Sequence, residues 1–334
     1  MAITLEEMKV GMSDKVKAGV IDVFLEESDI LQALPFDDAV SPSGGSTLTY
    51  GYVQEKVPGQ TSFRALNTEY KASTAKTEQK SVNLKIFGGA FEIDRVLKKA
   101  EGMYNNVAFQ MRKKIQSAVA TFHDAMINGD AATDEDAFDG LDKFLVGQKT
   151  EYNTDAVIDI STKAKLEENA STFYEKLKKL ISATNADAIM VNEDMKLKIE
   201  SVAAFLGYKT ATEEAFGRTY TKIGDKVRIM DLGNKVEVSG EDGEETVSEE
   251  PIIAIKERTV GGSATTGITD IYAVHFGVED GFCGVTLTGN NGVDQYLPDF
   301  KQPGAVKKGE VEMVACVALK RTKAAGVLRN IKIQ

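Results

Sequence analysis

The chain has 334 residues and a mass of 36.2 kDa, with 42% apolar residues, 27% charged residues and a formal net charge of −11. This composition is typical of a soluble globular protein with one large or two ordinary domains, and it excludes a collagen, a disordered chain and a disulfide-stapled miniprotein. No stretch is long and apolar enough to span a membrane and the first residues do not resemble a secretory signal, so we expect no membrane partner.

The charge changes sign along the chain. Residues 1–40 have a net charge of −6, residues 41–100 +4, residues 129–300 −16 and residues 301–334 +6. The negative total argues against a dedicated nucleic-acid-binding protein, because such proteins gain affinity by neutralising phosphates. Segments of opposite charge are suited instead to contacts between copies of the chain.

Side chains for acid–base, redox or metal chemistry are scarce. The sequence contains two histidines, His123 and His275, and two cysteines, Cys283 and Cys316. It has no phosphate-binding loop, nucleophile elbow or zinc-protease motif. We expect buried free thiols and hydrogen-bonded histidines, and we predict no catalytic residue, no metal site and no cofactor. The chain is therefore predicted not to be an enzyme.

Two segments resemble ligand-binding loops only superficially. The aspartates of residues 130–139 do not have the spacing of a calcium loop, so we expect a polar loop there. Gly261-Gly262-Ser263 has neither the lysine of a phosphate-binding loop nor the glycine spacing of a dinucleotide site, and a surface turn is expected.

The N-terminal residues form a separate segment. Apolar side chains in residues 5–34 recur three or four positions apart, which favours a helix. Pro35 and the run Ser41-Pro42-Ser43-Gly44-Gly45 interrupt this pattern. We expect either a helix docked on the domain or an arm that lies on another molecule.

A long polar hairpin is predicted next. Alternating apolar residues indicate strands at Thr47–Val53 and Val82–Ile86, and 28 residues lie between them. Those residues have few large apolar side chains and five basic ones, with a turn expected at Pro58-Gly59. Such a segment cannot build a core of its own. It is either a disordered insert or an arm supported by another subunit.

The strongest helix pattern follows. After a turn expected at Gly88-Gly89, a short strand leads to Asp94, a good N-cap residue. Residues 103–127 then have apolar side chains along one stripe, and Asn128-Gly129 ends the helix. A helix of this length is expected to support a sheet or a partner.

The rest of the chain alternates between strands and helices. We predict a helix at 166–181 and another that Asn192 caps and that runs through residue 203. A surface hairpin tip is expected at 241–245, and strands at 156–160, 188–191, 227–232, 252–255, 271–276, 285–287, 311–319 and 326–333.

The order of these parts resembles the major capsid protein of tailed bacteriophages, which has the Hong Kong 97-type capsid fold. The similarity extends over nearly the whole chain as an order of elements. Its local landmarks are Phe91-Glu92-Ile93-Asp94-Arg95, Ile127-Asn128-Gly129-Asp130 and Phe138-Asp139-Gly140-Leu141. The implied fold class is α+β, with an extended hairpin, called the E-loop, that lies across a neighbouring subunit.

The resemblance also implies a division of the chain. It places an N-terminal arm at 1–45, the E-loop at 46–81, a peripheral domain at 82–137 with a spine helix at 103–128, an α/β axial domain at 138–288, and a return to the peripheral domain with C-terminal strands at 289–334. The expected subunit contact is the tip of the E-loop, at Val57, Pro58, Gly59, Phe63 and Arg64.

The implied function is structural. A protein of this family assembles with itself, as pentamers and hexamers, into a procapsid and then into the icosahedral shell of a virion. The implied partners are a separate scaffolding protein, the portal, head-completion proteins and, by non-specific contact, the packaged double-stranded DNA. Assembly is expected in the host cytoplasm. Two alternatives remain open: an encapsulin-type nanocompartment shell protein, and a cytoplasmic α/β enzyme with a long insert.

Overall fold

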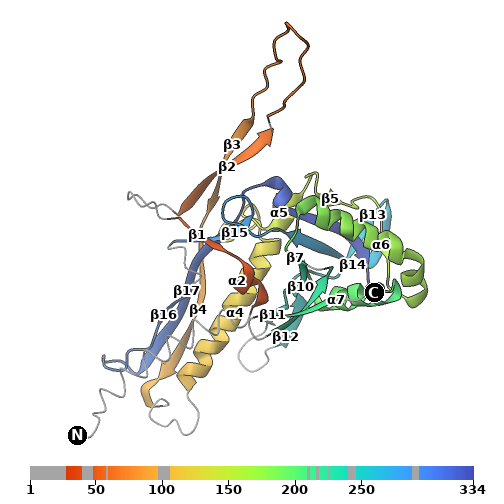
Figure 1. The fold of residues 1–334 in the computed structure, drawn as a ribbon. Helices are drawn as coiled ribbons and strands as arrows, with labels where there is room; N and C mark the ends of the chain where they lie inside the picture. The colour runs from red at the N-terminus through yellow and green to blue at the C-terminus, as the bar shows by residue number, and fades with distance from the viewer. Residues whose placement is uncertain are drawn as a thin grey trace.

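The computed structural model describes residues 28–39, 48–57, 59–96, 106–208, 211–215, 218–224, 226–239, 246–287 and 293–334. These residues form two lobes, each built around a β-sheet, and a hairpin that projects far from both (Figure 1). The long helix α4 (Asn106–Asn128) runs along the first lobe, and helices α6 (Lys163–Thr184) and α7 (Glu193–Phe205) belong to the second (Figure 1). The fold is therefore α+β, as expected.

The first lobe contains a five-stranded sheet whose longest member is β17 (Val306–Leu319). Strand β17 pairs along one edge with β4 (Lys85–Asp94), and along the other edge with β15 (Phe282–Thr286) and β16 (Asp294–Tyr296). Helix α4 packs on one face of this sheet through the predicted apolar stripe, including Met111, Ile115 and Phe122, which are fully buried. The predicted long helix is thus confirmed from residue 106 onward, while residues 103–105 lie outside the described part.

The second lobe is a nine-stranded sheet in which parallel and antiparallel pairs are mixed. Its main order is β5-β18-β14-β7-β10-β9-β8, with β6 also paired to β18 and β13 to β14. The strands are β5 (Glu151–Tyr152), β6 (Ile158–Asp159), β7 (Ala188–Val191), β8 (Ala211–Ala215), β9 (Arg218–Ile223), β10 (Val227–Asp231), β13 (Lys256–Val260), β14 (Ser263–Val274) and β18 (Ala325–Lys332).

The two faces of this sheet belong to different cores, because side chains alternate along each strand. In β7, Ile189 and Val191 pack with α6 and α7. Ala188 and Met190 point to the other face and join the core of the first lobe, together with α4 and the short helix α5 (Leu141–Leu145). One apolar core therefore continues from the first sheet to the second.

Part of the predicted N-terminal arm belongs to this core. Helix α2 (Asp29–Ala33) buries Ile30 and Leu31, and strand β1 (Phe36–Asp38) pairs in parallel with β15. For residues 28–38 the structure thus shows the docked-helix alternative, while the expected end of the arm at residue 45 lies outside the described residues. Residues 1–27 and 40–45 lie outside the described part.

Two turns bring the end of α4 to the second lobe. The amide of Gly140 donates a hydrogen bond to the carbonyl of Gly129 (2.8 Å), and the amide of Ala131 donates to Asp139 Oδ1 (2.9 Å). A Cβ atom on Gly129 would lie only 2.2 Å from the carbonyl oxygen of Phe138. Gly129 and Gly140, which belong to two separate landmarks of the sequence, are therefore in contact. We call this contact the joint between the lobes, and its close backbone approach requires glycine at residue 129.

Several predicted boundaries are wrong. Gly88 and Gly89 do not turn the chain: they lie inside β4 and pair with β17. Residues 252–255 follow the end of β12 (Thr246–Pro251) and form no strand; β12 pairs with β11 (Asn234–Ser239) in a separate hairpin, and the predicted tip at 241–245 lies outside the described residues. At the C-terminal side, β15 belongs to the first sheet and β18 to the second.

Candidate assembly surfaces

The projecting hairpin consists of β2 (Thr49–Val57), β3 (Lys76–Asn83) and the residues between them (Figure 1). Its root is held by the first lobe. Tyr52 and Gln54 point toward the body and are buried, while Val53 on the opposite face is exposed. The side-chain amide of Gln54 donates a hydrogen bond to the carbonyl of Leu319 at the end of β17 (3.2 Å).

An ion pair between Asp37 and Lys320 also stabilises the root of the hairpin. The Tyr50 hydroxyl and the Lys320 ammonium both donate to Oδ2 of Asp37, at 2.5 Å and 2.8 Å, and Lys320 lies 5.1 Å from the centre of the Tyr50 ring. Burial would raise the pKa of Asp37, but the hydrogen bonds from Lys320 and Tyr50 outweigh it and lower that pKa. Burial, together with the bond to Asp37, raises the pKa of Tyr50 to about 12. Strands β1, β2 and β17 are thereby joined.

The register of the hairpin shifts by one residue between Glu55 and Val57, at the end of its root. Val57 pairs with Lys76, and further out the amide of Gln60 donates to Oγ of Ser73 (3.2 Å). The chain reverses at Ala65–Thr68, where the Thr68 amide donates to the Ala65 carbonyl (3.3 Å) and Asn67 has a φ of 65°. A positive φ at the third position is the requirement of a type II turn, and asparagine tolerates it.

The tip therefore lies at residues 65–68, beyond the expected 57–63. Pro58 falls outside the described residues, and Gly59 lies across from Ala75 in the middle of the arm. The sequence pattern Pro-Gly is a strong turn signal, and the strand pairing does end at Val57, directly before it; the chain nevertheless does not reverse there, and the Gln60 amide still reaches the Ser73 hydroxyl across the arm.

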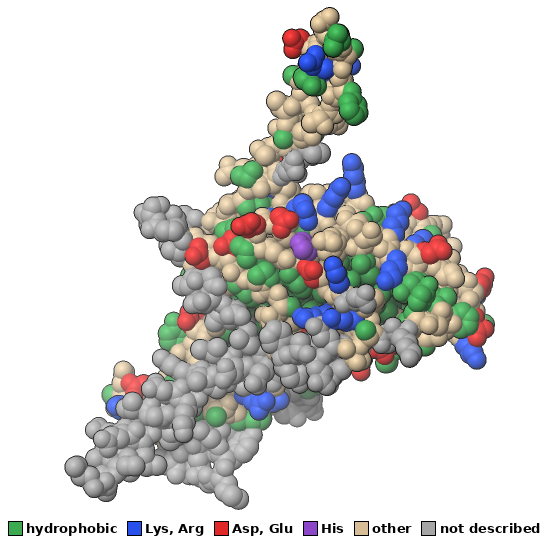
Figure 2. All heavy atoms as spheres, viewed as in Figure 1, with side chains coloured by type: hydrophobic (Ala, Val, Ile, Leu, Met, Phe, Trp, Pro, Cys, Tyr) green, Lys and Arg blue, Asp and Glu red, His purple; other side chains and the backbone are tan. Residues whose placement is uncertain are grey.

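The side chains of the distal half are unusual for an exposed segment. Phe63 and Leu66 are almost completely exposed, and Tyr70 is exposed beside Arg64, whose guanidinium lies 5.2 Å from the Tyr70 ring centre. Figure 2 shows these apolar and charged groups gathered at the far end of the arm. Clustered exposed apolar side chains are typical of an interaction site.

Of the predicted contact residues, the structure places Phe63 and Arg64 near the tip and Val57, half exposed, at the end of β2. The residues that anchor the root, Asp37 and Lys320, were not predicted. No local pattern could identify them, because they are 283 positions apart and meet only after β1 and β17 have joined the same sheet.

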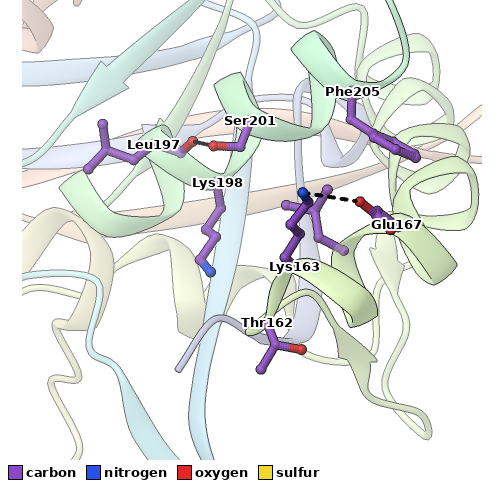
Figure 3. Close-up of a pocket in the computed structure, with 8 residues that line it drawn as sticks. Thr162, Lys163, Glu167, Leu197, Lys198, Ser201 and Phe205 are labelled. Carbon is purple, nitrogen blue, oxygen red and sulfur yellow. Dashed lines mark hydrogen bonds and ion pairs between the residues drawn. The ribbon is translucent and has the colours of Figure 1, made fainter.

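The grooves of the body are open and several of their polar groups are paired locally. Figure 3 shows one between α6 and α7, of about 420 Å³, in which Lys163 faces Glu167 (3.9 Å) and the Ser201 hydroxyl donates to the Leu197 carbonyl (2.8 Å). A larger groove of about 970 Å³ lies at the hairpin root, where Arg321 pairs with Asp280 (3.3 Å).

The predicted fates of the reactive residues can be compared with the structure. Cys283 and Cys316 are buried free thiols and His123 is a buried, hydrogen-bonded helix residue, as predicted. His275 lies at the end of β14 with Nδ1 2.7 Å from Asp187. Within the described residues, no group of three or more His, Cys, Asp or Glu is placed to hold a metal ion.

The glycine-rich turn and the described helices can also be compared with the expectations. Gly261 and Gly262 have φ values of 59° and 84° and form the turn between β13 and β14, which confirms the predicted surface turn. No described helix is both long and apolar enough to cross a membrane.

Comparison with known proteins identifies the fold but no sequence relative. No protein-family model matches the chain, and no curated protein matches it at a significant level. Among solved structures, the capsid of a native GTA particle is 13% identical over 91% of this chain and 90% of its own, with a TM-score of 0.56.

Two further structures show the same likeness. The SrpI encapsulin from Synechococcus elongatus PCC 7942 is 14% identical over 91% of this chain and 87% of its own, with a TM-score of 0.54. The capsid protein of the cyanophage P-SCSP1u is 11% identical over 90% of this chain and 87% of its own, with a TM-score of 0.50. The chain thus has the Hong Kong 97-type fold of tailed-phage major capsid proteins, which an encapsulin shares.

Proposed function

We propose that this chain is the major capsid protein of a tailed bacteriophage, which assembles as pentamers and hexamers into an icosahedral shell around packaged double-stranded DNA. The observation that carries this proposal is the projecting hairpin. Its distal half exposes Phe63, Leu66 and Tyr70, and the hydrogen bonds described for residues 59–75 all lie within the hairpin. An arm of this kind is best explained by a neighbouring subunit that it contacts.

In this proposal the hairpin is the E-loop, the five-stranded lobe is the peripheral domain and the nine-stranded lobe is the axial domain that surrounds the symmetry axes. A closed shell needs heterologous contacts, in which one surface binds a different surface of the next copy. The arm and the body of this chain provide two such different surfaces. A separate scaffolding protein, a portal and head-completion proteins are the proposed partners, and the virion is the proposed location.

Replacing the distal hairpin tests the proposal. Residues 58–75 are replaced by Asn-Gly, which can join Val57 to Lys76 in a two-residue turn. We expect a folded subunit with an unchanged melting temperature that forms no rings or shells in electron microscopy. The full-length variant Phe63→Ser/Leu66→Ser/Tyr70→Ser serves as a control that keeps the arm and removes only its apolar side chains; it should assemble poorly. Shells formed by the shortened chain, or a wild-type chain that never leaves the monomer, would contradict the proposal.

An encapsulin-type shell is the second candidate, because the SrpI encapsulin has the same fold at a TM-score of 0.54. The two candidates differ in what the shell contains. Particles isolated from the organism that makes the chain should contain nuclease-resistant double-stranded DNA if the chain is a phage capsid protein. Particles that contain an enzyme and no DNA would support the encapsulin alternative.

A further inference from the structure

The groove of about 970 Å³ at the hairpin root is bounded by three parts of one chain. Strands β2 and β3 supply the first wall, in which Lys80 points toward the body because it is directly opposed to the buried Tyr52. Residues 148–150, which follow α5, supply the second wall, and the two connections between the sheets, at 279–280 and 320–323, supply the third. A ligand in this groove would contact the hairpin and the body at once.

The wall made by the two connections is already ordered without a ligand. The amide of Lys320 donates a hydrogen bond to the carbonyl of Gly281 (3.1 Å), and the amide of His275 donates to the carbonyl of Ala324 (2.7 Å). The Arg321 guanidinium also pairs with Asp280 across them (3.3 Å). A preformed wall lowers the entropic cost of binding.

Cationic side chains are in excess around the groove. Its lining contains five cationic residues and three acidic ones. Beyond the two ion pairs already described, Lys80, Lys149 and Lys323 make no ion pair within the described part of the chain, although Glu78 and Glu279 also line the groove. The three lysines come from the three different walls, so their charges repel one another until an anion lies between them.

The same groove contains a hydroxyl without a partner. Thr150 is only 4% exposed, and its Oγ1 atom has no hydrogen-bond partner among the described residues. The backbone of Thr150 is fixed, because its carbonyl accepts from the Val327 amide (3.0 Å) on β18. A buried hydroxyl without a partner is unfavourable, and an acceptor oxygen of a ligand would supply the missing hydrogen bond.

The size of the groove indicates which kind of anion it takes. A volume of about 970 Å³ lies within the range of about 300–1,000 Å³ that is typical of small-molecule sites. A DNA duplex spreads its phosphates over a much wider surface than one groove. A short phosphate chain carries several negative charges close together, accepts hydrogen bonds from hydroxyl groups, and is commonly bound by lysine.

We propose that this groove binds a small multivalent phosphate, either a short polyphosphate or the triphosphate of a nucleotide. The anion lies between Lys80 of the hairpin and Lys149 and Lys323 of the body, and the Thr150 hydroxyl donates to it. The bound anion thereby joins the hairpin to the body and restricts the direction in which the hairpin projects. The site lies within one chain, so it does not depend on the proposed shell assembly.

Calorimetric titration of the full-length chain with tripolyphosphate at low salt tests the site. Lys149→Ala/Lys323→Ala should weaken binding about tenfold or more, and the matched pair Lys163→Ala/Lys301→Ala, exposed and outside the groove, should not. Thr150→Val should weaken binding at least threefold without lowering the melting temperature, because the hydroxyl has no partner before the ligand binds. No binding at millimolar tripolyphosphate, or equal affinity in all these chains, would overturn the inference.

Parallel titrations identify the source of the phosphate. Tighter binding of ATP than of tripolyphosphate assigns a nucleotide, whereas equal or weaker binding assigns the phosphate chain alone. A short DNA duplex that displaces tripolyphosphate, and that binds the Lys149→Ala/Lys323→Ala chain poorly, would overturn the assignment to a small anion, because the groove would then be a nucleic-acid contact.

Hydrogen exchange tests the bridge without any substitution. With saturating tripolyphosphate, the amides of β2 and β3 should exchange at least threefold more slowly, and the slowing should exceed that in α7, which lies outside the groove. Unchanged exchange in β2 and β3 would overturn the proposed link between the hairpin and the body.

Discussion

The Ser28 hydroxyl and the Nε2 atom of His123 lie 2.7 Å apart, although 95 positions separate the two residues. On the other side of the ring, Nδ1 lies 3.0 Å from the carbonyl oxygen of Leu232, which can only accept a hydrogen bond. Nδ1 therefore carries the proton and Nε2 accepts from Ser28, whose oxygen in turn accepts from the Leu31 amide as the cap of α2. One neutral imidazole thus joins α2, α4 and the end of β10.

This arrangement predicts a loss of stability in mild acid. Burial lowers the pKa of His123 to about 4, although the Leu232 carbonyl and the nearby Asp29 favour the charged form. The unfolded chain binds the proton below pH ~6.5 and the folded chain does not until pH ~4, so the free energy of unfolding falls as the pH drops through this window, by up to ~3 kcal/mol. Urea unfolding of the unassembled subunit between pH 7 and pH 4.5 measures the effect. His123→Gln should unfold more easily at pH 7 but with a shallower pH dependence; equal slopes for both chains would contradict the assignment.

The joint between the lobes predicts a sharp difference between two glycines. Gly129→Ala should destabilise the subunit by about 1–3 kcal/mol or more, because the new Cβ would lie 2.2 Å from the Phe138 carbonyl oxygen and 2.4 Å from that of Ala125. In the control Gly59→Ala, the nearest atom to the new Cβ is 3.9 Å away, so stability should hardly change. Thermal unfolding of both variants provides the comparison. Equal melting temperatures would show that the joint can relax.

The root of the hairpin predicts a local effect of Asp37→Asn. The variant leaves the Lys320 ammonium, which is largely buried, without its carboxylate, at a cost of about 1–3 kcal/mol. Amide hydrogen exchange in β2 and β3 should accelerate at least tenfold, while exchange in α6 and α7 stays the same. Asp38→Asn, an exposed neighbour, is the matched control. Uniform acceleration throughout the chain would indicate a global loss of stability and not a loosened root.

The two cysteines should be inert in the folded subunit. Burial raises the pKa of the Cys283 thiol to about 11 and, with the neighbouring Cys283, that of Cys316 to about 12. Thiol reagents attack the thiolate, so a colorimetric titration should detect no reactive group before denaturant is added and two groups afterward. Rapid reaction of either thiol in the native chain would contradict its buried position.

Local signals in the sequence were sufficient for many elements. The stripe of residues from Val107 to Met126 predicted α4, and the four residues of β7 were predicted without error, followed by Asn192 as the cap of α7. These elements depend on periodicity and on capping, and both act over a few neighbouring residues.

The errors have a common physical origin in contacts between distant residues. Gly88 and Gly89 looked like a turn because nothing nearby shows that β17 will pair with them more than 200 positions later in the chain. The hairpin tip was placed too early because the Pro-Gly signal ends the strand pairing without reversing the chain, which turns only at Ala65–Thr68, where Asn67 adopts a positive φ. In the candidate contact surface, the exposed side chains could be identified from composition, but the Asp37–Lys320 anchor could not.

Strand β18 determines when the second sheet can be completed during synthesis of the chain. It lies between β14 on one edge and the short strands β5 and β6 on the other, so a growing chain has no partner for β5 or β6 among the described strands until residues 325–332 leave the ribosome. The contact spans more than 170 positions, and closing so long a loop is slow compared with forming helices. The second sheet of a nascent subunit therefore remains incomplete until nearly all of the chain has been translated.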